Sequence, residues 1–302
     1  MTDLVHHPAT PTVTPAVVTA PELLVLEPSV GRGPTRRLRR RPRELHLHLV
    51  LLTLLVLVAV FPGLAATHDP LALDGMPFQP PSGSFWFGTD EIGRDLWSRV
   101  VHGLRISFFS SALAVVVALV LGSVVGIASG VRRGGVLDRL LSILTEAVMA
   151  VPAVLLALAA ITAYGRGAYI AAVAIGVAEA TGFARLVRGL VIQAQTLGYV
   201  EAARTCGTQP WRVLTRHVIP AVYPPVLSYT AMHFGLAMLA IGSLSYLGFG
   251  EAPPSPEWGV LIAGGQKYLV HAWWVAIIPG VALTAVVVLL NRIAFLLQEN
   301  RP

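Results

Sequence analysis

Six long apolar segments constrain the fold of this 302-residue chain more than any other feature of its sequence. Few acidic or basic side chains interrupt them. At a rise of about 1.5 Å per residue, a helix of such a length crosses the hydrocarbon core of a bilayer, which is ~30 Å thick. The sequence therefore predicts an all-α membrane protein with six transmembrane helices, near residues 45–66, 107–130, 139–162, 168–190, 222–248 and 274–297.

The composition agrees with a chain that lies mostly in lipid. Charged residues make up 13% of the chain and hydrophobic residues 55%, whereas soluble domains average about 25% charged residues. A soluble fold would lack the polar shell needed to cover so much apolar surface. Membrane lipid is therefore an expected partner, and a disordered chain or a nucleic-acid binder is excluded as the main interpretation. The single cysteine, Cys206, excludes an intrachain disulfide and a multi-cysteine metal site.

The apolar segments divide the chain into soluble and membrane parts. We expect a mobile, basic tail over residues 1–44, because its Pro-, Thr- and Ala-rich composition buries too little surface to offset chain entropy. A cleaved signal peptide is the alternative for 45–66, but signal-peptide cores span only about 7 to 15 residues and start near the N-terminus. The other parts are an outer loop at 67–106, a membrane core at 107–297 with an inner loop at 191–221, and a C-terminal end at 298–302.

The positive charges predict the orientation. With the N-terminus in the cytoplasm, 17 of the 22 lysines and arginines fall in the tail, the inner segments and the C-terminal end. Cytoplasmic segments carry the excess of Lys and Arg in membrane proteins. We therefore expect a multi-pass protein of the cell membrane with both termini in the cytoplasm. The five cations left outside are Arg94, Arg99, Arg105, Arg166 and Lys267.

The sequence patterns of common catalytic sites are missing. A phosphate-binding loop needs a lysine followed by Ser or Thr, but Lys267, the only lysine, is followed by Tyr268. The nine histidines lack zinc-type spacing, and no nucleophile elbow occurs. We therefore expect no catalytic residue, no metal site and no cofactor bound by this chain, which is not expected to be an enzyme.

The inner loop at 191–221 contains a pattern typical of two short helices joined by a turn. Gly207 suits the left-handed position that ends a helix, and Pro210 suits the first turn of the next one. Small alanines before the glycine allow another backbone to approach closely, so this segment would fit a cleft on a partner. Helix physics alone leaves an ordinary surface hairpin as the alternative.

This loop resembles the EAA loop of ABC-importer permeases, in which Glu-Ala-Ala precedes a glycine and a basic stretch that ends in proline. Two further segments, Phe87–Asp95 and Leu244–Gly250, resemble signatures of the dipeptide/oligopeptide/nickel permeases. The first of them points to the C-type subunit of that family. The resemblance covers about residues 40–297.

The resemblance implies a type I importer permease fold in which the inner loop forms a cytoplasmic coupling helix. The residues that it implies for the contact with the ATPase are Glu201, Ala202, Ala203, Arg204, Gly207, Arg212 and Pro220. The implied function is ATP-driven, binding-protein-dependent import of di- or oligopeptides, or of a related small nutrient, by alternating access. The implied partners are a second permease subunit, cytoplasmic ATPase subunits that bind ATP and Mg, and an extracytoplasmic substrate-binding protein. An ion-driven secondary carrier and a non-transporting membrane scaffold are the alternatives.

The outer segment at 94–108 is predicted to be an amphipathic helix that lies in the membrane interface. Leu96, Val100, Leu104 and Phe108 recur every four residues and would form one apolar stripe. We expect Asp95 to pair with Arg99 at the i, i+4 spacing. A gate, a binding-protein contact and a structural lid are all open interpretations. The candidate residues for the first two roles are Asp90, Arg94, Asp95 and Arg99.

Ionisable residues in membrane segments are costly and often functional. Glu146, Glu179 and His233, together with Tyr229, are therefore candidates for the substrate path. For the two glutamates, a position near a helix end with access to water is the alternative. Pro152 and Pro279 are each expected to kink the helix that contains them.

Overall fold

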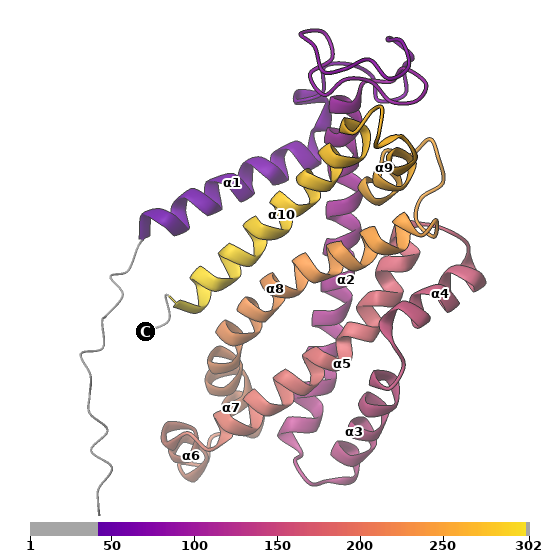
Figure 1. Cartoon of the computed structure of the whole chain (residues 1–302). Coiled ribbons are helices and arrows are strands. Elements are labelled where there is room, and N and C mark those ends of the chain that lie inside the picture. The colour runs from indigo at the N-terminus through magenta and orange to yellow at the C-terminus, as the bar shows by residue number, and fades with distance from the viewer. Residues whose placement is uncertain (1–41, 300–302) are drawn as a thin grey trace, which may run out of the picture. The chain divides into compact units, whose positions relative to one another are not determined.

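The computed structural model describes residues 42–299, and all regular elements of this part of the chain are helices (Figure 1). Residues 1–41 and 300–302, which make up most of the expected tail at 1–44 and of the C-terminal end at 298–302, lie outside the described residues. The longer helices are α1 (Pro42–Val60), α2 (Leu96–Val131), α3 (Val136–Met149), α4 (Ala153–Tyr164), α5 (Ala168–Gln195), α8 (Ile219–Tyr246) and α10 (Trp274–Glu299). The short helices are η1 (Pro62–Leu64), α6 (Gly198–Thr205), α7 (Pro210–Val213), η2 (Leu214–Val218), α9 (Trp258–Gly265) and η3 (Gln266–Tyr268).

Four helical segments of the described part are long and apolar enough to cross a membrane: α2, α5, the continuous stretch Pro210–Tyr246, and α10. The pair α3 and α4 makes a fifth if it counts as one span. The apolar stretch described in α1, His46–Val60, is shorter. The prediction of an all-α membrane fold is confirmed, although these criteria give four or five crossings in residues 42–299 and not the expected six.

Helix α2 joins two segments that the sequence pattern separates. It begins at Leu96 and runs without a break to Val131, so the outer loop expected at 67–106 ends at Asp95. The predicted stripe of four apolar residues is helical, and it is buried in the first hydrophobic cluster of the protein core. The helix starts where it does because the Asp95 carboxylate accepts the N–H of Ser98 at 3.0 Å and caps the first turn.

The segment expected to form one span at 139–162 is broken into α3 and α4, which meet at 81°. Pro152 lies at the break, directly before the first residue of α4. Proline has no N–H to donate, and its ring disfavours helical geometry in the residue before it. The expected kink at Pro152 is therefore a complete interruption of the helix.

Helix α2 packs along α5 more extensively than any other two helices of the described part. Three glycines of α2, spaced four residues apart, face α5 at Gly122, Gly126 and Gly130. A β-carbon added at Gly126 would lie only 2.7 Å from the carbonyl oxygen of Ala184. Small residues at this spacing let two membrane helices approach backbone to backbone.

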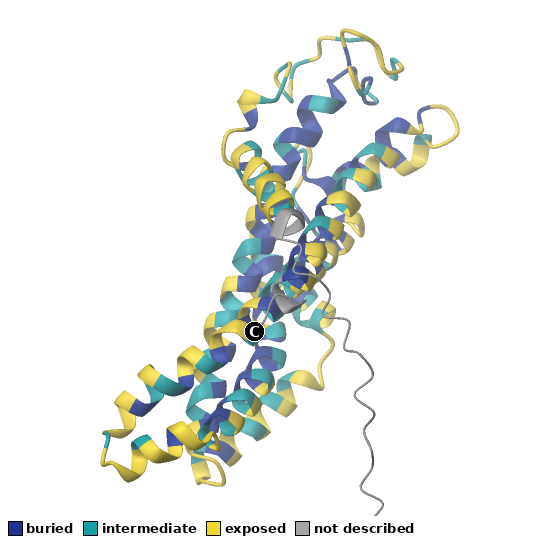
Figure 2. Ribbon diagram, turned by 90° about the vertical axis from the view of Figure 1, so that its left-hand side faces the viewer, coloured by how far each residue is buried: buried dark blue, intermediate teal, exposed yellow. Residues whose placement is uncertain are grey.

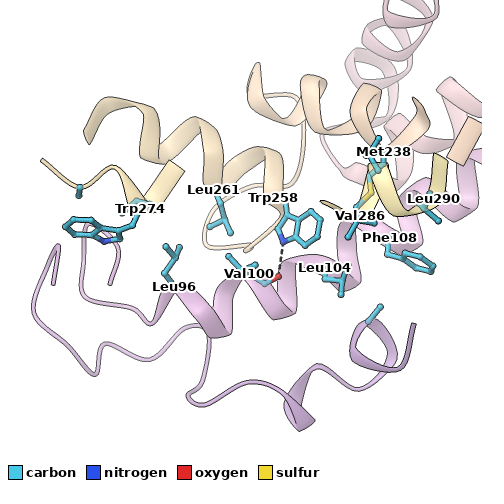
Figure 3. Packing of buried hydrophobic residues seen from close by; sticks show 14 residues of the cluster. Leu96, Val100, Leu104, Phe108, Met238, Trp258, Leu261, Trp274, Val286 and Leu290 are labelled. Atoms are coloured by element: carbon cyan, nitrogen blue, oxygen red, sulfur yellow. Dashed lines mark hydrogen bonds between the residues drawn. The ribbon is translucent and has the colours of Figure 1, made fainter. Parts of the chain in front are cut away.

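Three clusters of buried hydrophobic residues follow one another through the bundle. The first joins the start of α2 to α9 and α10 (Figure 3), the second joins α2, α4, α5 and α8, and the third joins α5 to α6, α7 and the start of α8. In the first cluster the indole nitrogen of Trp258 donates to the carbonyl of Val100 at 2.8 Å. Figure 2 shows exposed residues on the outward faces of the helices, as expected for a bundle surrounded by lipid or by partner subunits.

Candidate functional site

The inner loop forms two short helices, α6 and α7, at the end of the bundle where α2 ends (Figure 1). Gly207 follows α6 with φ +77°, which is the left-handed conformation expected for it. Its N–H donates to the carbonyl of Arg204 at 2.9 Å, and the N–H of Thr208 donates to that of Ala203 at 3.1 Å. These two bonds form a Schellman motif. With Pro210 in the first turn of α7, the predicted helix–turn–helix is confirmed.

Three valines anchor these short helices to the bundle. Val200, Val213 and Val218 are buried in the third hydrophobic cluster. Ala203 is half-buried and packs against this cluster, whereas the other candidate contact residues are exposed, namely Glu201, Ala202, Arg204, Gly207, Arg212 and Pro220. No atom lies within 4 Å of a β-carbon added at Gly207. The turn is therefore a rigid, projecting surface with open space in front of its glycine.

A chain of hydrogen bonds connects α6 to two long helices. The Arg204 guanidinium donates to the Gln195 side-chain carbonyl at 2.9 Å. The amide nitrogen of Gln195, at the end of α5, donates to the Gly130 carbonyl of α2 at 3.1 Å. This connection was not predicted, because Gln195 has no partner that sequence spacing indicates.

At the opposite end of the bundle, three of the four outer candidate residues, Asp90, Arg94 and Arg99, form a buried polar network. Asp90 accepts the Nε–H of Arg94 at 2.6 Å, and its carboxylate lies 3.4 Å from the Nε of Arg99. Arg99 also donates to the carbonyls of Pro70 at 3.2 Å and Pro254 at 3.4 Å. The network therefore joins the segment before α2 to the segment before α9.

The expected pairing of Asp95 with Arg99 is wrong. Asp95 instead accepts hydrogen bonds from the Ser98 hydroxyl at 2.6 Å and the Thr67 hydroxyl at 3.0 Å, and its carboxylate lies 3.5 Å from His68 Nδ1. All of these contacts are made by Oδ2 of Asp95, whereas Arg99 lies beside the carboxylate of Asp90. Since all four candidate residues are buried, they shape the outer surface from beneath it.

Three of the four candidates for the substrate path lie together between α5 and α8. The Nδ1 of His233 lies 3.0 Å from Oε2 of Glu179. The ring of Tyr229 lies 4.1 Å from that of His233 and also contacts Phe183. Glu179 is in the middle of α5, so the alternative of a position near a helix end is wrong for it. Gly182 makes room for the ring of Tyr229, because a β-carbon there would lie 3.1 Å from the hydroxyl.

The fourth candidate, Glu146, lies elsewhere. It lines a cavity of about 140 Å³ between α2, α3 and α5, together with Arg185 and Arg188. Arg188, which lines this cavity, forms an ion pair with Asp138 of α3. Neither arginine was a candidate from the sequence.

A buried carboxyl group in the segment before α9 was also not predicted. Glu257 accepts the N–H of Gly259 at 3.1 Å and that of Val260 at 3.3 Å, and so caps α9. The side chain is almost completely buried, and this burial raises the pKa of its carboxyl above the usual range. A glutamate at a helix start was a signal for a cap, but its burial depends on tertiary packing.

Known proteins provide the decisive comparison. The family described as "Binding-protein-dependent transport system inner membrane component" matches residues 118–300. The chain belongs to this family. The protein is therefore a permease subunit, and the helical fold and the EAA-like loop agree with that assignment.

Individual relatives support the same family. The permease is 36% identical over 230 residues to "Probable D,D-dipeptide transport system permease protein DdpC" of Escherichia coli (strain K12), covering 75% of this chain and 77% of that one. It is 35% identical over 211 residues to the glutathione transport system permease protein GsiD of Pectobacterium atrosepticum, covering 70% of each chain.

A solved structure supports the fold. The permease resembles a chain from the crystal structure of an amino acid ABC transporter with histidines, with a TM-score of 0.54 at 17% identity. The match covers 67% of the permease and 94% of that chain. The permease therefore shares its helical fold with this chain of an ABC transporter, in agreement with the predicted importer-permease fold, whereas the six crossings are not confirmed within the described residues.

Proposed function

We propose that this permease subunit moves peptides, or small molecules that contain a peptide bond, into the cell by alternating access. The names of its relatives support this substrate class, because a D,D-dipeptide and glutathione both contain peptide bonds. ATP hydrolysis would take place on a separate subunit, so the permease itself is non-catalytic and binds neither ATP nor Mg.

The observation that carries the proposal is the projecting turn between α6 and α7. Its valine anchors are buried, whereas its alanine- and arginine-bearing face is exposed, as a docking surface for an ATPase requires. A rigid turn transmits a movement of the ATPase to the membrane helices better than a mobile loop does, because a mobile loop would change its own conformation instead. The contact residues are Glu201, Ala202, Ala203, Arg204, Gly207, Arg212 and Pro220.

The proposed orientation places α6 and α7 in the cytoplasm. The connection between α2 and α3, at the same end of the bundle, carries Arg132 and Arg133, in agreement with the positive-inside rule. The six crossings needed to bring both termini to the cytoplasm would include α1 and the bent pair α3–α4. The segment before α2 then faces the extracytoplasmic side.

The proposed complex contains a second permease subunit, one or two ATPase subunits and an extracytoplasmic substrate-binding protein. On the outer side, the network of Asp90, Arg94 and Arg99 would hold the two outer segments in the shape that the binding protein contacts. Because these side chains are buried, they would act on the contact through the backbone they support. Asp95 would act in the same way by fixing the start of α2.

Within the membrane, the cluster of Glu179, Tyr229 and His233 is the proposed polar element of the substrate path. Its carboxylate is partly exposed, whereas the histidine is nearly buried. A carboxylate beside an aromatic ring is suited to the ammonium end of a peptide. The cavity at Glu146 is a separate site.

The test is ATPase activity and dipeptide uptake with the permease co-expressed with the adjacent permease and ATPase genes in nanodiscs or proteoliposomes. We expect the binding protein loaded with a dipeptide to stimulate ATP hydrolysis. Uptake by the permease alone under an ion gradient would identify a secondary carrier. Stable extraction without an ATPase and without transport would identify a scaffold.

A further inference from the structure

The cavity of about 140 Å³ between α2, α3 and α5 is lined by polar side chains that the proposed transport cycle does not use. Ser129 comes from the last turns of α2, Thr145 and Glu146 from α3, and Arg185 and Arg188 from α5. The cavity thus lies close to the end of the bundle that carries α6 and α7 (Figure 1).

The hydroxyl groups of this cavity offer only acceptor positions. Ser129 donates its hydroxyl hydrogen to the Val125 carbonyl at 2.9 Å, and Thr145 donates to the Leu141 carbonyl at 2.7 Å. A hydroxyl whose hydrogen is used in this way retains its oxygen lone pairs. These two oxygens therefore add to the acceptor capacity of the nearby Glu146 carboxylate.

Glu146 and Arg185 carry the available charges. Arg188 is already neutralised by its two hydrogen bonds to Asp138, at 2.8 and 3.0 Å. Among the described residues, the Arg185 guanidinium has no carboxylate partner, and its Nη2 lies 2.6 Å from the Sδ of Met149. Glu146 likewise forms no ion pair within the described part of the chain.

We propose that this cavity binds a small zwitterion, whose ammonium group is held by Glu146 with the two hydroxyl oxygens and whose anion is held by Arg185. An ammonium brings three N–H donors to a site with three acceptor groups, and a guanidinium presents five donors to a carboxylate or phosphate. The site is distinct from the coupling surface and from the Glu179–His233 pair.

Two sources have this chemistry. One is the phosphoethanolamine headgroup of a membrane lipid, and the other is a free amino acid or dipeptide. The cavity opens within the last turns of α2, at headgroup depth if this end lies at the membrane surface. The adjoining face of α3 exposes Leu140, Ile143 and Leu144, which would contact acyl chains.

The experiment uses the full-length permease with its co-purifying subunits in phosphatidylcholine nanodiscs. Phosphatidylethanolamine is titrated in one arm and L-alanyl-L-alanine in the other, and bound molecules are counted by native mass spectrometry. Phosphatidylcholine is a built-in control, because its quaternary ammonium has no N–H to donate. We expect one of the two probes to bind at least about tenfold more tightly to wild type than to Glu146→Gln or Arg185→Gln.

The matched control is Arg139→Gln, which removes a cation from the exposed face of α3 without touching the cavity. It should bind like wild type, and Arg185→Lys should retain part of the affinity. Preference for the lipid alone identifies the headgroup as the source, and preference for the dipeptide identifies a soluble zwitterion. Binding of both probes that is unchanged in the two cavity variants, or absent altogether, overturns the proposal. Because the readout is binding, it is independent of whether the complex transports peptides.

Discussion

Arg188 of α5 holds Asp138 of α3 through two parallel hydrogen bonds, with Nε 2.8 Å from Oδ1 and Nη2 3.0 Å from Oδ2. The same carboxylate accepts the N–H of Gly134 at 2.9 Å. One buried carboxylate thus fixes the connection between α2 and α3 and ties it to α5. A two-bond arrangement of this kind is stronger and more directional than an ordinary surface ion pair.

Removing either partner of this pair should destabilise the protein. Asp138→Ala leaves the Gly134 N–H without its acceptor, and Arg188→Ala leaves a buried carboxylate without its guanidinium partner. We expect each to lower the free energy of unfolding by about 1–3 kcal/mol. The double variant should lose less than the two single losses combined, because both remove the same interaction. Thermal unfolding in detergent measures these losses of stability, with Arg139→Ala as the neutral control. A loss in the double variant equal to the sum of the two single losses would contradict the prediction.

The turn at Gly207 should be sensitive to backbone strain. Gly207→Val should reduce uptake per ATP hydrolysed, because a β-branched residue is disfavoured at φ +77° by about 1–2 kcal/mol and would shift the turn. Gly207→Asn is the matched control, since asparagine tolerates this conformation. Membrane insertion and helix content should stay normal in both. If the Gly207→Val and wild-type complexes had the same uptake per ATP hydrolysed, the turn would not be part of the coupling surface.

The close contact between α2 and α5 should not tolerate a side chain at Gly126. Gly126→Leu places atoms where the Ala184 carbonyl and the Val187 β-carbon already lie at 2.7 Å from an added β-carbon, and should cost about 1–3 kcal/mol or more. Gly189→Leu is the control, because it lies in α5 with nothing within 4 Å of an added β-carbon. The melting temperatures of the two variants in the same detergent measure the difference. A melting temperature for Gly126→Leu equal to that of the control would disprove the close packing.

Glu257 should make stability depend on pH. Burial raises the pKa of its carboxyl above the ordinary value of 4.5, so the folded state binds the proton more tightly than the unfolded state. Its favourable contribution is therefore complete below the ordinary pKa and is lost as the pH rises through the raised value. Glu257→Gln retains an acceptor for the cap of α9 and removes the titration.

Melting curves of wild type and Glu257→Gln between about pH 4 and pH 8 test this prediction. The wild type should lose stability relative to the variant as the pH rises. Glu257→Ala, which removes the cap as well, should be less stable than Glu257→Gln at every pH, by about 1 kcal/mol. If the stability of the wild type relative to Glu257→Gln increased with pH, the pH dependence would have the opposite sign and the raised pKa would be refuted.

Local signals predicted the features that depend on local geometry. Gly207 and Pro210 define the helix–turn–helix because each residue type fixes its own backbone conformation. Pro152 likewise marked the interruption between α3 and α4, although the angle of 81° is set by how the two helices pack on the bundle. The start of α2 was misplaced because hydropathy changes gradually there, whereas the cap at Asp95 is sharp.

Contacts between distant segments could not be predicted in the same way. Glu179 and His233 were each identified from the cost of placing an ionisable group in a membrane, but their pairing depends on how α5 packs against α8. The expected pair of Asp95 and Arg99 was wrong because spacing alone does not show that Arg99 packs against Asp90 while Asp95 caps the start of α2. Arg185 and Glu146 illustrate the same limit, since the cavity they line exists only once three helices meet.

The three glycines of α2 also determine the stiffness of the bundle. Where side chains separate two helices, the side chains can change rotamer when one helix shifts slightly against the other. Where the two backbones touch, no side chain lies between them that could adjust in this way. Helix α2 spans about 54 Å at 1.5 Å per residue. We therefore expect α2 and α5 to move together as one stiff unit. The Asp95 cap lies at one end of α2, and the Gly130 carbonyl, which accepts the hydrogen bond from Gln195, lies near the other. Under the proposed coupling, we expect a force applied at α6 to move the capped end of α2 as well, so that both ends of the bundle respond together.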